Sequence, residues 1–147
     1  MPLNILKAAT LAAAAGLAIQ TQALCQKPCK TYYQSITVTI SKNGTAPSVS
    51  PDPACVANGG QMSWHATDGG SWSTDFNDDA HSPFNPGKTH HAGAVGVTRG
   101  DRVRKCSTNN PAYNAAAGAC VFKYKASHTK NGKTSVIDPQ VIIQPGA

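Results

Sequence analysis

The chain has 147 residues and a formal net charge of +6; 40% of its residues are hydrophobic, 6% aromatic and only 14% charged, and all seven acidic residues are aspartates. Long solvated helices and coiled coils depend on Glu and Lys, so this composition argues against a helical bundle. The length suits one domain, and a chain of this size buries roughly two thirds of its unfolded surface on folding.

Residues 1–23 have the pattern of a secretory signal peptide. Lys7 precedes an apolar run from Ala8 to Ala18, and Thr21-Gln22-Ala23 supplies a cleavage site. The run is far shorter than the roughly 20 residues needed to cross a bilayer, and no later stretch approaches that length. We therefore expect an exported protein, periplasmic or extracellular, with residues 1–23 removed and no transmembrane segment.

All five cysteines follow this segment, and export places them in an oxidising compartment where disulfides persist. Their spacings match no zinc ribbon or finger. Cys106 and Cys120 bracket a loop of Asn, Ala, Gly and Pro that burial alone cannot hold, so we expect a disulfide between them. The second expected disulfide joins Cys55 to Cys29 or Cys25, and we select Cys29.

Residues 24–60 are expected to add one strand and a loop to the domain. Hydrophobic residues alternate with polar ones from Gln34 to Ile40, which is typical of a strand with one buried face. Residues 45–60 are rich in Pro, Ser, Asp and Gly and predict an ordered loop.

The core of the domain is expected within residues 61–147. Alternation from Gln61 to Ala66 and again from Trp72 to Phe76 predicts a hairpin that turns at Asp68-Gly69-Gly70 and holds two tryptophans inward. Residues 77–93 have no pattern, and such long loops are often functional. Val95 and Val97 predict a short strand, and Ala115-Ala116-Ala117 predicts one helical turn.

The clearest predicted unit is the last hairpin. Alternation from Cys120 to Ala126 predicts a strand, and Asn131-Gly132 predicts a type I′ turn. The return strand covers residues 135–143. Because Pro139 cannot donate a hydrogen bond to a sheet, we expect this strand to be an edge or to be bulged at Asp138-Pro139.

These short strands predict an all-β fold: an antiparallel Greek-key sandwich, cupredoxin-like or immunoglobulin-like, stabilised by disulfides. Several segments carry a resemblance: Trp64, Trp72 to Phe76, Ser82-Pro83-Phe84, Tyr124-Lys125, and Asp138-Pro139 followed by Val141-Ile142-Ile143. Over residues 61–144 the chain resembles small exported bacterial proteins with a cupredoxin-like sandwich. The resemblance implies a fold far more than a function.

Blue copper is the first chemistry to consider for such a sandwich. That site needs a Cys thiolate, two His and usually a weak axial Met, three of them grouped on one hairpin. After Cys120 the only histidine is His128, and no methionine follows it. We therefore expect the type 1 copper ligands to be absent.

A different metal site is the alternative hypothesis. Its candidate ligands for copper or zinc are Asp78, Asp79, His81, His90 and His91. No periodicity forces these side chains together, so we favour a solvated polar loop and no cofactor. His65 and His128 either join them or are simply exposed.

Two basic segments, residues 99–105 and 123–133, suggest a cationic face. Nucleic acid is not the expected partner. Nucleic-acid-binding proteins with a sandwich or barrel fold interleave exposed aromatic residues with basic ones, whereas Phe122 and Tyr124 are expected to point inward. The candidates for exposed rings are Tyr32, Tyr33, Tyr113 and Phe84, without a pattern that links them.

No serine-hydrolase, zinc-protease or phosphate-loop motif is present, so we expect no enzyme, with a secreted hydrolase or toxin as the weakest alternative. The leading hypothesis is an exported binding or assembly protein with its contact surface on residues 77–93. Its partner is another protein or a second copy, and the strand around Pro139 and residues 24–33 are candidates for self-association by strand addition.

Overall fold

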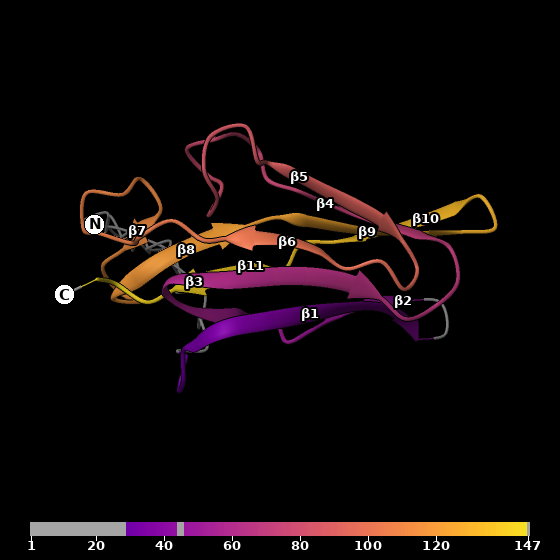
Figure 1. Ribbon diagram of the computed structural model, residues 1–147, viewed down its shortest axis with the longest axis horizontal. Helices are drawn as coiled ribbons and strands as arrows, with labels where there is room; N and C mark the ends of the chain where they lie inside the picture. Colours follow the sequence, from indigo (N-terminus) through magenta and orange to yellow (C-terminus); the bar gives the residue numbers. More distant parts are fainter. Residues whose placement is uncertain (1–28, 44–45, 147) are drawn as a thin grey trace, which may run out of the picture.

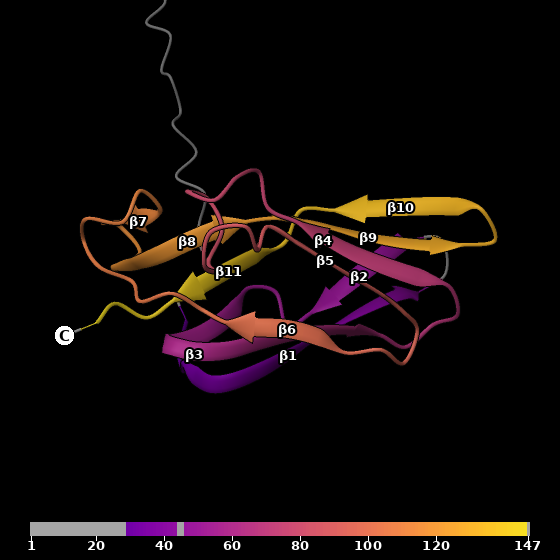
Figure 2. The same ribbon diagram turned by 45° about the horizontal axis from the view of Figure 1, so that its top comes forward.

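The computed structural model describes residues 29–43 and 46–146, and all regular structure in these ranges is β-strand. The strands form two sheets that lie against each other (Figure 1, Figure 2). The prediction of an all-β protein built from two sheets is therefore confirmed. The predicted signal segment and Cys25 lie outside the described residues.

The larger sheet has seven strands, in the order β2-β1-β3-β11-β8-β7, with β6 also paired to β3. Its members are β1 (Tyr33–Asn43), β2 (Ala46–Ser50), β3 (Ala54–Ala66), β6 (Arg99–Arg102), β7 (Tyr113–Asn114), β8 (Ala119–Lys123) and β11 (Gln140–Ile143). β3 runs parallel to both β1 and β11, so this sheet is mixed. The prediction of a purely antiparallel sandwich is wrong here, because parallel neighbours are joined by crossover connections that local alternation does not reveal.

The smaller sheet has four strands in the order β10-β9-β4-β5, all antiparallel. They are β4 (Ser71–Asp75), β5 (His90–Ala94), β9 (Lys125–Lys130) and β10 (Lys133–Ile137). Figure 1 shows this sheet as the upper layer, running along the long axis of the molecule.

Aromatic rings from both layers meet in the core around Trp64 of β3, which is fully buried. Its ring centroid lies 6.3 Å from that of Phe76, 5.5 Å from Phe84 and 5.8 Å from Tyr124. The indole Nε1 donates a hydrogen bond to the Tyr124 hydroxyl at 3.2 Å, so both polar tips are paired inside the core. Burial raises the pKa of the Tyr124 hydroxyl well above its usual value.

The predicted hairpin between residues 61 and 76 is wrong. β3 belongs to the larger sheet and β4 to the smaller one, so residues 67–70 cross from one layer to the other. Trp64 and Trp72 both point inward, as expected, but from opposite sheets. Alternation shows only that one face is buried, and two facing sheets give the same signal as two paired strands.

Three local predictions are also corrected. Residues 45–60 contain β2 and the beginning of β3 in addition to a loop. Val95 and Val97 follow β5, whose small residues carry no apolar alternation and are placed by backbone pairing with β4. The alanines at 115–117 form the turn between β7 and β8, where the Ala117 amide donates to Asn114 Oδ1 at 3.0 Å.

The turn of the last hairpin is confirmed, but the strand predicted from Cys120 to Ala126 is divided at Tyr124 into β8 of the larger sheet and β9 of the smaller one. Asn131 and Gly132 have φ angles of 52° and 69°, as a type I′ turn requires. The return strand is interrupted at Asp138-Pro139, as predicted, and divides into β10 and β11. β10 is an edge of the smaller sheet whereas β11 lies inside the larger one, so the edge prediction holds for the first half only.

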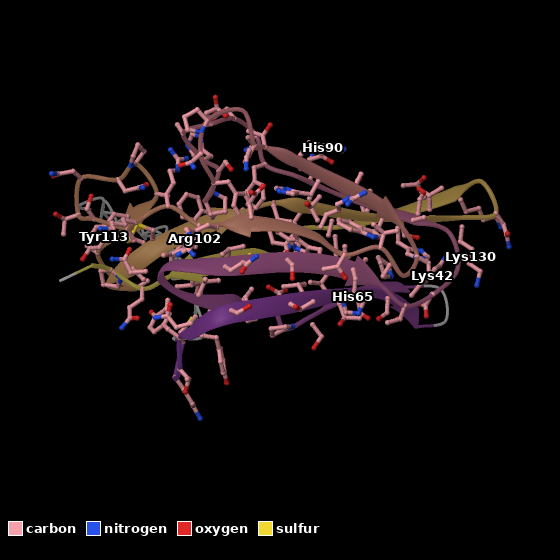
Figure 3. All side chains as sticks on the ribbon, viewed as in Figure 1. Lys42, His65, His90, Arg102, Tyr113 and Lys130 are labelled. Atoms are coloured by element: carbon pink, nitrogen blue, oxygen red, sulfur yellow. A yellow bond between two sulfur atoms is a disulfide. The ribbon has the colours of Figure 1, made fainter. Side chains whose placement is uncertain are left out.

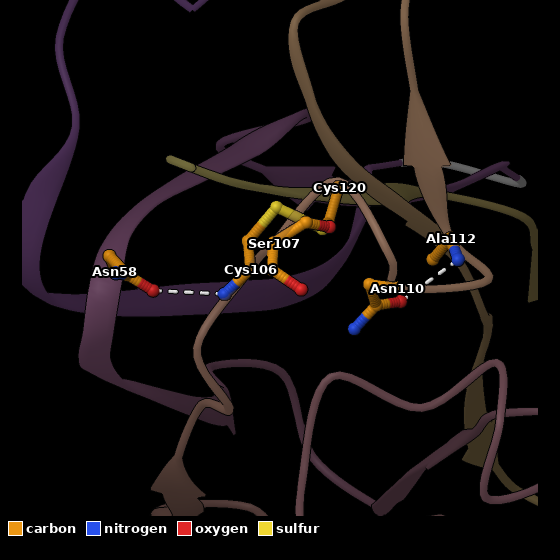
Figure 4. Close-up of a disulfide and its surroundings, with 6 residues drawn as sticks. All are labelled: Asn58, Cys106, Ser107, Asn110, Ala112 and Cys120. Carbon is orange, nitrogen blue, oxygen red and sulfur yellow. Dashed lines mark hydrogen bonds between the residues drawn. A yellow bond between two sulfur atoms is a disulfide. The ribbon is translucent and has the colours of Figure 1, made fainter. Parts of the chain in front are cut away.

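Both selected disulfides are present. Cys106 and Cys120 are bridged with Cα atoms 5.7 Å apart, and Cys29 and Cys55 with Cα atoms 5.8 Å apart. The Cys106 amide also donates to Asn58 Oδ1 at 2.9 Å, which ties this loop to β3 (Figure 4). Closing a loop of this length stabilises a fold by about 3 kcal/mol.

Candidate functional site

The connection between β4 and β5 is the longest loop that the structure describes, and one of its side chains is buried in the core. Its base is closed by the Phe76 amide, which donates to the Thr89 carbonyl at 2.9 Å. Phe84 is fully buried, with its ring edge-on to Trp64 and to Phe76. The expectation that Phe84 is an exposed ring is therefore wrong, because the ring packs into the core against Trp64 and Phe76.

Arg104, just after β6, fastens the same loop. Its backbone amide donates to the Pro83 carbonyl at 2.7 Å, and its Nη2 donates to the carbonyls of Asp79 and Ser82. A guanidinium has several donors in a fixed plane and can serve two carbonyls at once. This residue of the predicted cationic face therefore has a structural use.

Side-chain hydrogen bonds within the loop complete its shape. Asp79 accepts from the Gly87 amide at 2.7 Å, and the Ser82 hydroxyl donates to the Lys88 carbonyl at 3.1 Å. The Phe84 amide donates to the same hydroxyl at 3.2 Å. The loop is consequently a fixed platform whose outer side is polar.

Two His–Asp pairs lie on the exposed side. His81 Nδ1 is 2.8 Å from Asp78 Oδ1, and the His81 amide donates to the same oxygen at 2.9 Å. These hydrogen bonds to the carboxylate, the backbone bond first, hold the pKa of Asp78 below its usual value. His90 Nδ1 is 2.5 Å from Asp75 Oδ1 across the β4–β5 pair, and Figure 3 shows His90 on the outside of the molecule.

His91 is different because its side chain is only 8% exposed. Its ring packs against both Trp64 and Phe84, with each centroid distance 4.9 Å. Its Nε2 is 3.3 Å from Asp101 Oδ2, and the Lys88 ammonium is 2.6 Å from the other oxygen of that carboxylate. Desolvation lowers the pKa of His91, although the contact with Asp101 opposes it.

The five predicted metal ligands are thus distributed among separate contacts. Asp78 pairs with His81, Asp79 binds a backbone amide, His90 pairs with Asp75, and His91 points into the core. In the ranges 29–43 and 46–146, no three His, Cys, Asp or Glu side chains gather as a metal site would need. A metal site on this loop remains a prediction to which the geometry lends no support.

His128, considered above as an exposed or ligating residue, is fully buried in β9. Its Nε2 lies 3.0 Å from the Asp68 carbonyl, and Asp68 in turn accepts a hydrogen bond from the Lys42 amide. His128 follows Ala126 by two residues and so continues the alternation that begins at Cys120. The sequence pattern therefore predicts that the His128 side chain points inward. His65, by contrast, is half-buried on the outer face of β3.

The predicted basic face is divided between structural and exposed groups. Arg102 Nη1 donates a hydrogen bond to the Gly59 carbonyl at 2.9 Å. The lysines of β8, β9 and β10 are exposed on another part of the surface. Figure 3 shows Arg102 and Lys130 far apart along the molecule. These basic residues do not form one continuous stripe.

Among the described residues, no helix is long and apolar enough to cross a membrane. No family model, no curated protein and no solved structure matches this chain.

Proposed function

We propose that this protein is an exported, non-enzymatic binding protein that uses residues 77–89 as its contact surface. One observation carries the proposal: a long loop without regular structure is anchored by the buried Phe84 and by the hydrogen bonds of Arg104. Rigid loops bind with a small entropic cost, because little conformational freedom remains to be lost. The outer side presents exposed polar groups, among them Asp78, His81 and Asn85.

Export is supported by the signal pattern and by the two disulfides, which persist in oxidising compartments. A cupredoxin-like or immunoglobulin-like Greek key is our proposal for the exact topology, supported by the two facing sheets. A type 1 copper role receives no support from Cys120, since a sulfur bonded to Cys106 has no thiolate to offer a metal.

The absence of an enzymatic role is also a proposal. In the described part of the chain, the Ser82 hydroxyl is fully buried and hydrogen-bonded to a backbone carbonyl, and the His81 and His90 rings are paired with exposed carboxylates. A nucleophile needs a base within hydrogen-bond reach and room for a substrate. The loop presents no such set.

The test compares two double variants of matched chemistry. His81→Ala with Asn85→Ala removes exposed groups from the loop, whereas His65→Ala with Asn109→Ala removes the same residue types elsewhere. Each purified protein is immobilised and exposed to the exported proteins of its own cells, and the bound proteins are quantified by mass spectrometry.

We expect a partner that the unchanged protein and the control variant retain equally and that the loop variant retains at least about tenfold less, a loss of about 1.4 kcal/mol in binding. Equal retention by both variants, or no partner held above a blank surface, would contradict the proposal.

A further inference from the structure

β10 is the outer strand of the smaller sheet, and in the described chain it is hydrogen-bonded only to β9. Figure 2 shows it along the free margin of that sheet, with no strand beyond it. Lys130 and Lys133 flank the two-residue turn as a hydrogen-bonded pair. By alternation, Thr134 and Val136 direct their backbone N–H and C=O groups away from β9, towards solvent.

The side chains of β10 leave this edge open. Val136 is 52% exposed and is one of two large hydrophobic residues exposed in the described ranges, the other being Tyr33. Edge strands are usually protected by a lysine, a proline or a bulge in mid-strand. In β10 the only charged residue, Lys133, is the first residue of the strand, and Pro139 lies beyond its last residue. The middle of the strand therefore has neither a lysine nor a proline to protect it.

The other edges are less suited to pairing. β2 contains Pro47, which has no N–H to donate, and β7 has two residues. β5 lies beside β6, and Asp101 of β6 is bound there by both His91 and Lys88. β10 also lies near β2 of the larger sheet, but within the described ranges no ion pair and no strand pairing joins these two strands. β6, which in the described chain pairs only with β3, has four residues and no large apolar side chain. Of these described edges, only β10 combines five residues without proline with a large exposed apolar side chain, that of Val136.

We propose that β10 pairs antiparallel with β10 of a second copy of this chain, which joins the two smaller sheets into one continuous sheet of eight strands. Such an interface is isologous, since each copy contributes the same strand about a two-fold axis. The inference goes beyond the proposed function and does not depend on it, because residues 77–89 lie outside β10.

The register follows from the pleat. Residues that lie opposite each other in an antiparallel pair point to the same face of the sheet. The two-fold axis, which runs midway between the two strands, must therefore lie level with a residue, so that this residue faces its own copy. An axis at Ser135 places Thr134 of each copy opposite Val136 of the other, and these are the residues whose backbone groups are free. Each Val136 then packs against a threonine and loses its exposure.

Charge favours the same orientation. Lys133 begins β10 and Asp138 follows its end, and the described residues offer no ion-pair partner to either. Antiparallel pairing brings the basic end of one strand towards the acidic end of the other on both sides of the axis. Parallel pairing would instead align like charges.

The first test is sedimentation velocity of the non-reduced protein over a concentration series. We expect a dimer whose dissociation constant rises at least about tenfold in Val136→Lys, because a lysine in mid-edge blocks strand addition. Ser73→Lys, on the same outer face of the central strand β4, adds the same charge and is expected to leave the dimer unchanged. Thermal unfolding of both variants verifies that they fold.

The second test examines the register by oxidative crosslinking. With the axis at Ser135, the two Ser135 Cα atoms face each other at about 4.5 Å, whereas the two Thr134 Cα atoms are diagonal at about 7–8 Å. Ser135→Cys is expected to form an intermolecular disulfide, mapped to that position by peptide analysis, and Thr134→Cys is not.

A monomer at the highest concentration overturns the proposal, and so does a dimer that Val136→Lys and Ser73→Lys weaken equally. A dimer that Val136→Lys alone weakens, but that Thr134→Cys crosslinks in preference to Ser135→Cys, keeps the edge and overturns the register.

Discussion

Two connections in the smaller sheet each join neighbouring antiparallel strands, but they are stabilised in different ways. Residues 76–89 join β4 to β5, and Asn131-Gly132 joins β9 to β10. The short turn is fixed by the backbone conformation of its own two residues. The long loop depends on Phe84 in the core and on Arg104 from the larger sheet's side. Local chemistry specifies the first, and only the assembled sandwich specifies the second.

The largest expected effect comes from removing the loop's anchor in the core. Phe84→Ala should lower the free energy of unfolding by about 3–5 kcal/mol, since it deletes a fully buried ring and leaves a cavity. Denaturant unfolding of the non-reduced protein measures the loss, and hydrogen exchange should show residues 77–89 less protected. Tyr33→Ala, at an exposed ring, should cost within about 0.5 kcal/mol; an equal loss in both would contradict this account.

Arg104→Met keeps the aliphatic stem and removes the donors to the carbonyls of Asp79 and Ser82. We expect a loss of about 1–3 kcal/mol in unfolding free energy, because two loop carbonyls lose charge-assisted hydrogen bonds. The matched control is Arg99→Met at an exposed arginine of β6. If the two variants melt alike, the loop does not need this guanidinium.

Gly132→Ala tests the turn. Its φ of 69° lies in the left-handed region, where a Cβ costs about 1–2 kcal/mol although nothing crowds it in space. The loss should be confined to the β9–β10 hairpin, with exchange in residues 77–89 unchanged. Gly69→Ala, the same change at a glycine outside the left-handed region, is the control with no expected effect. Increased exchange in the loop would show that the two connections are coupled.

The smallest effect is a pH dependence from His91. Because burial lowers its pKa in the folded state, its neutral form contributes stability that is complete above the unfolded value of about 6.5 and is lost as pH falls through the lower folded pKa. His91→Gln should flatten the decline of unfolding free energy just below pH 6.5, by less than about 1.4 kcal/mol per pH unit. A steeper slope in His91→Gln than in the unchanged protein would contradict this sign.

Alternation placed individual side chains well. Trp64, Trp72, Phe122 and Tyr124 are inward as expected, because the pleat puts every second side chain on one face whatever the partner strand. His128 obeys the same rule, because it continues the alternation of buried residues along β9.

The candidate site was predictable in position but not in arrangement. The absence of any pattern marked residues 77–93 as a long loop, yet nothing local indicates that His91 turns into the core while His90 faces out with Asp75. Those directions depend on β5, which has no apolar alternation of its own and is placed as a strand by its hydrogen bonds to β4.

The sequence by itself indicated which residues are buried in its strong strands, the type I′ turn and the Cys106–Cys120 disulfide, since each depends on neighbouring residues. It left the partner of Cys55 open between Cys25 and Cys29, and the structure shows Cys29. Tertiary structure decided that β3 and β4 belong to different sheets, that β3 lies parallel to β1 and β11, and that the long loop is rigid. Backbone N–H and C=O groups are the same in every residue, so which strands pair is decided only when their edges meet in the folded core.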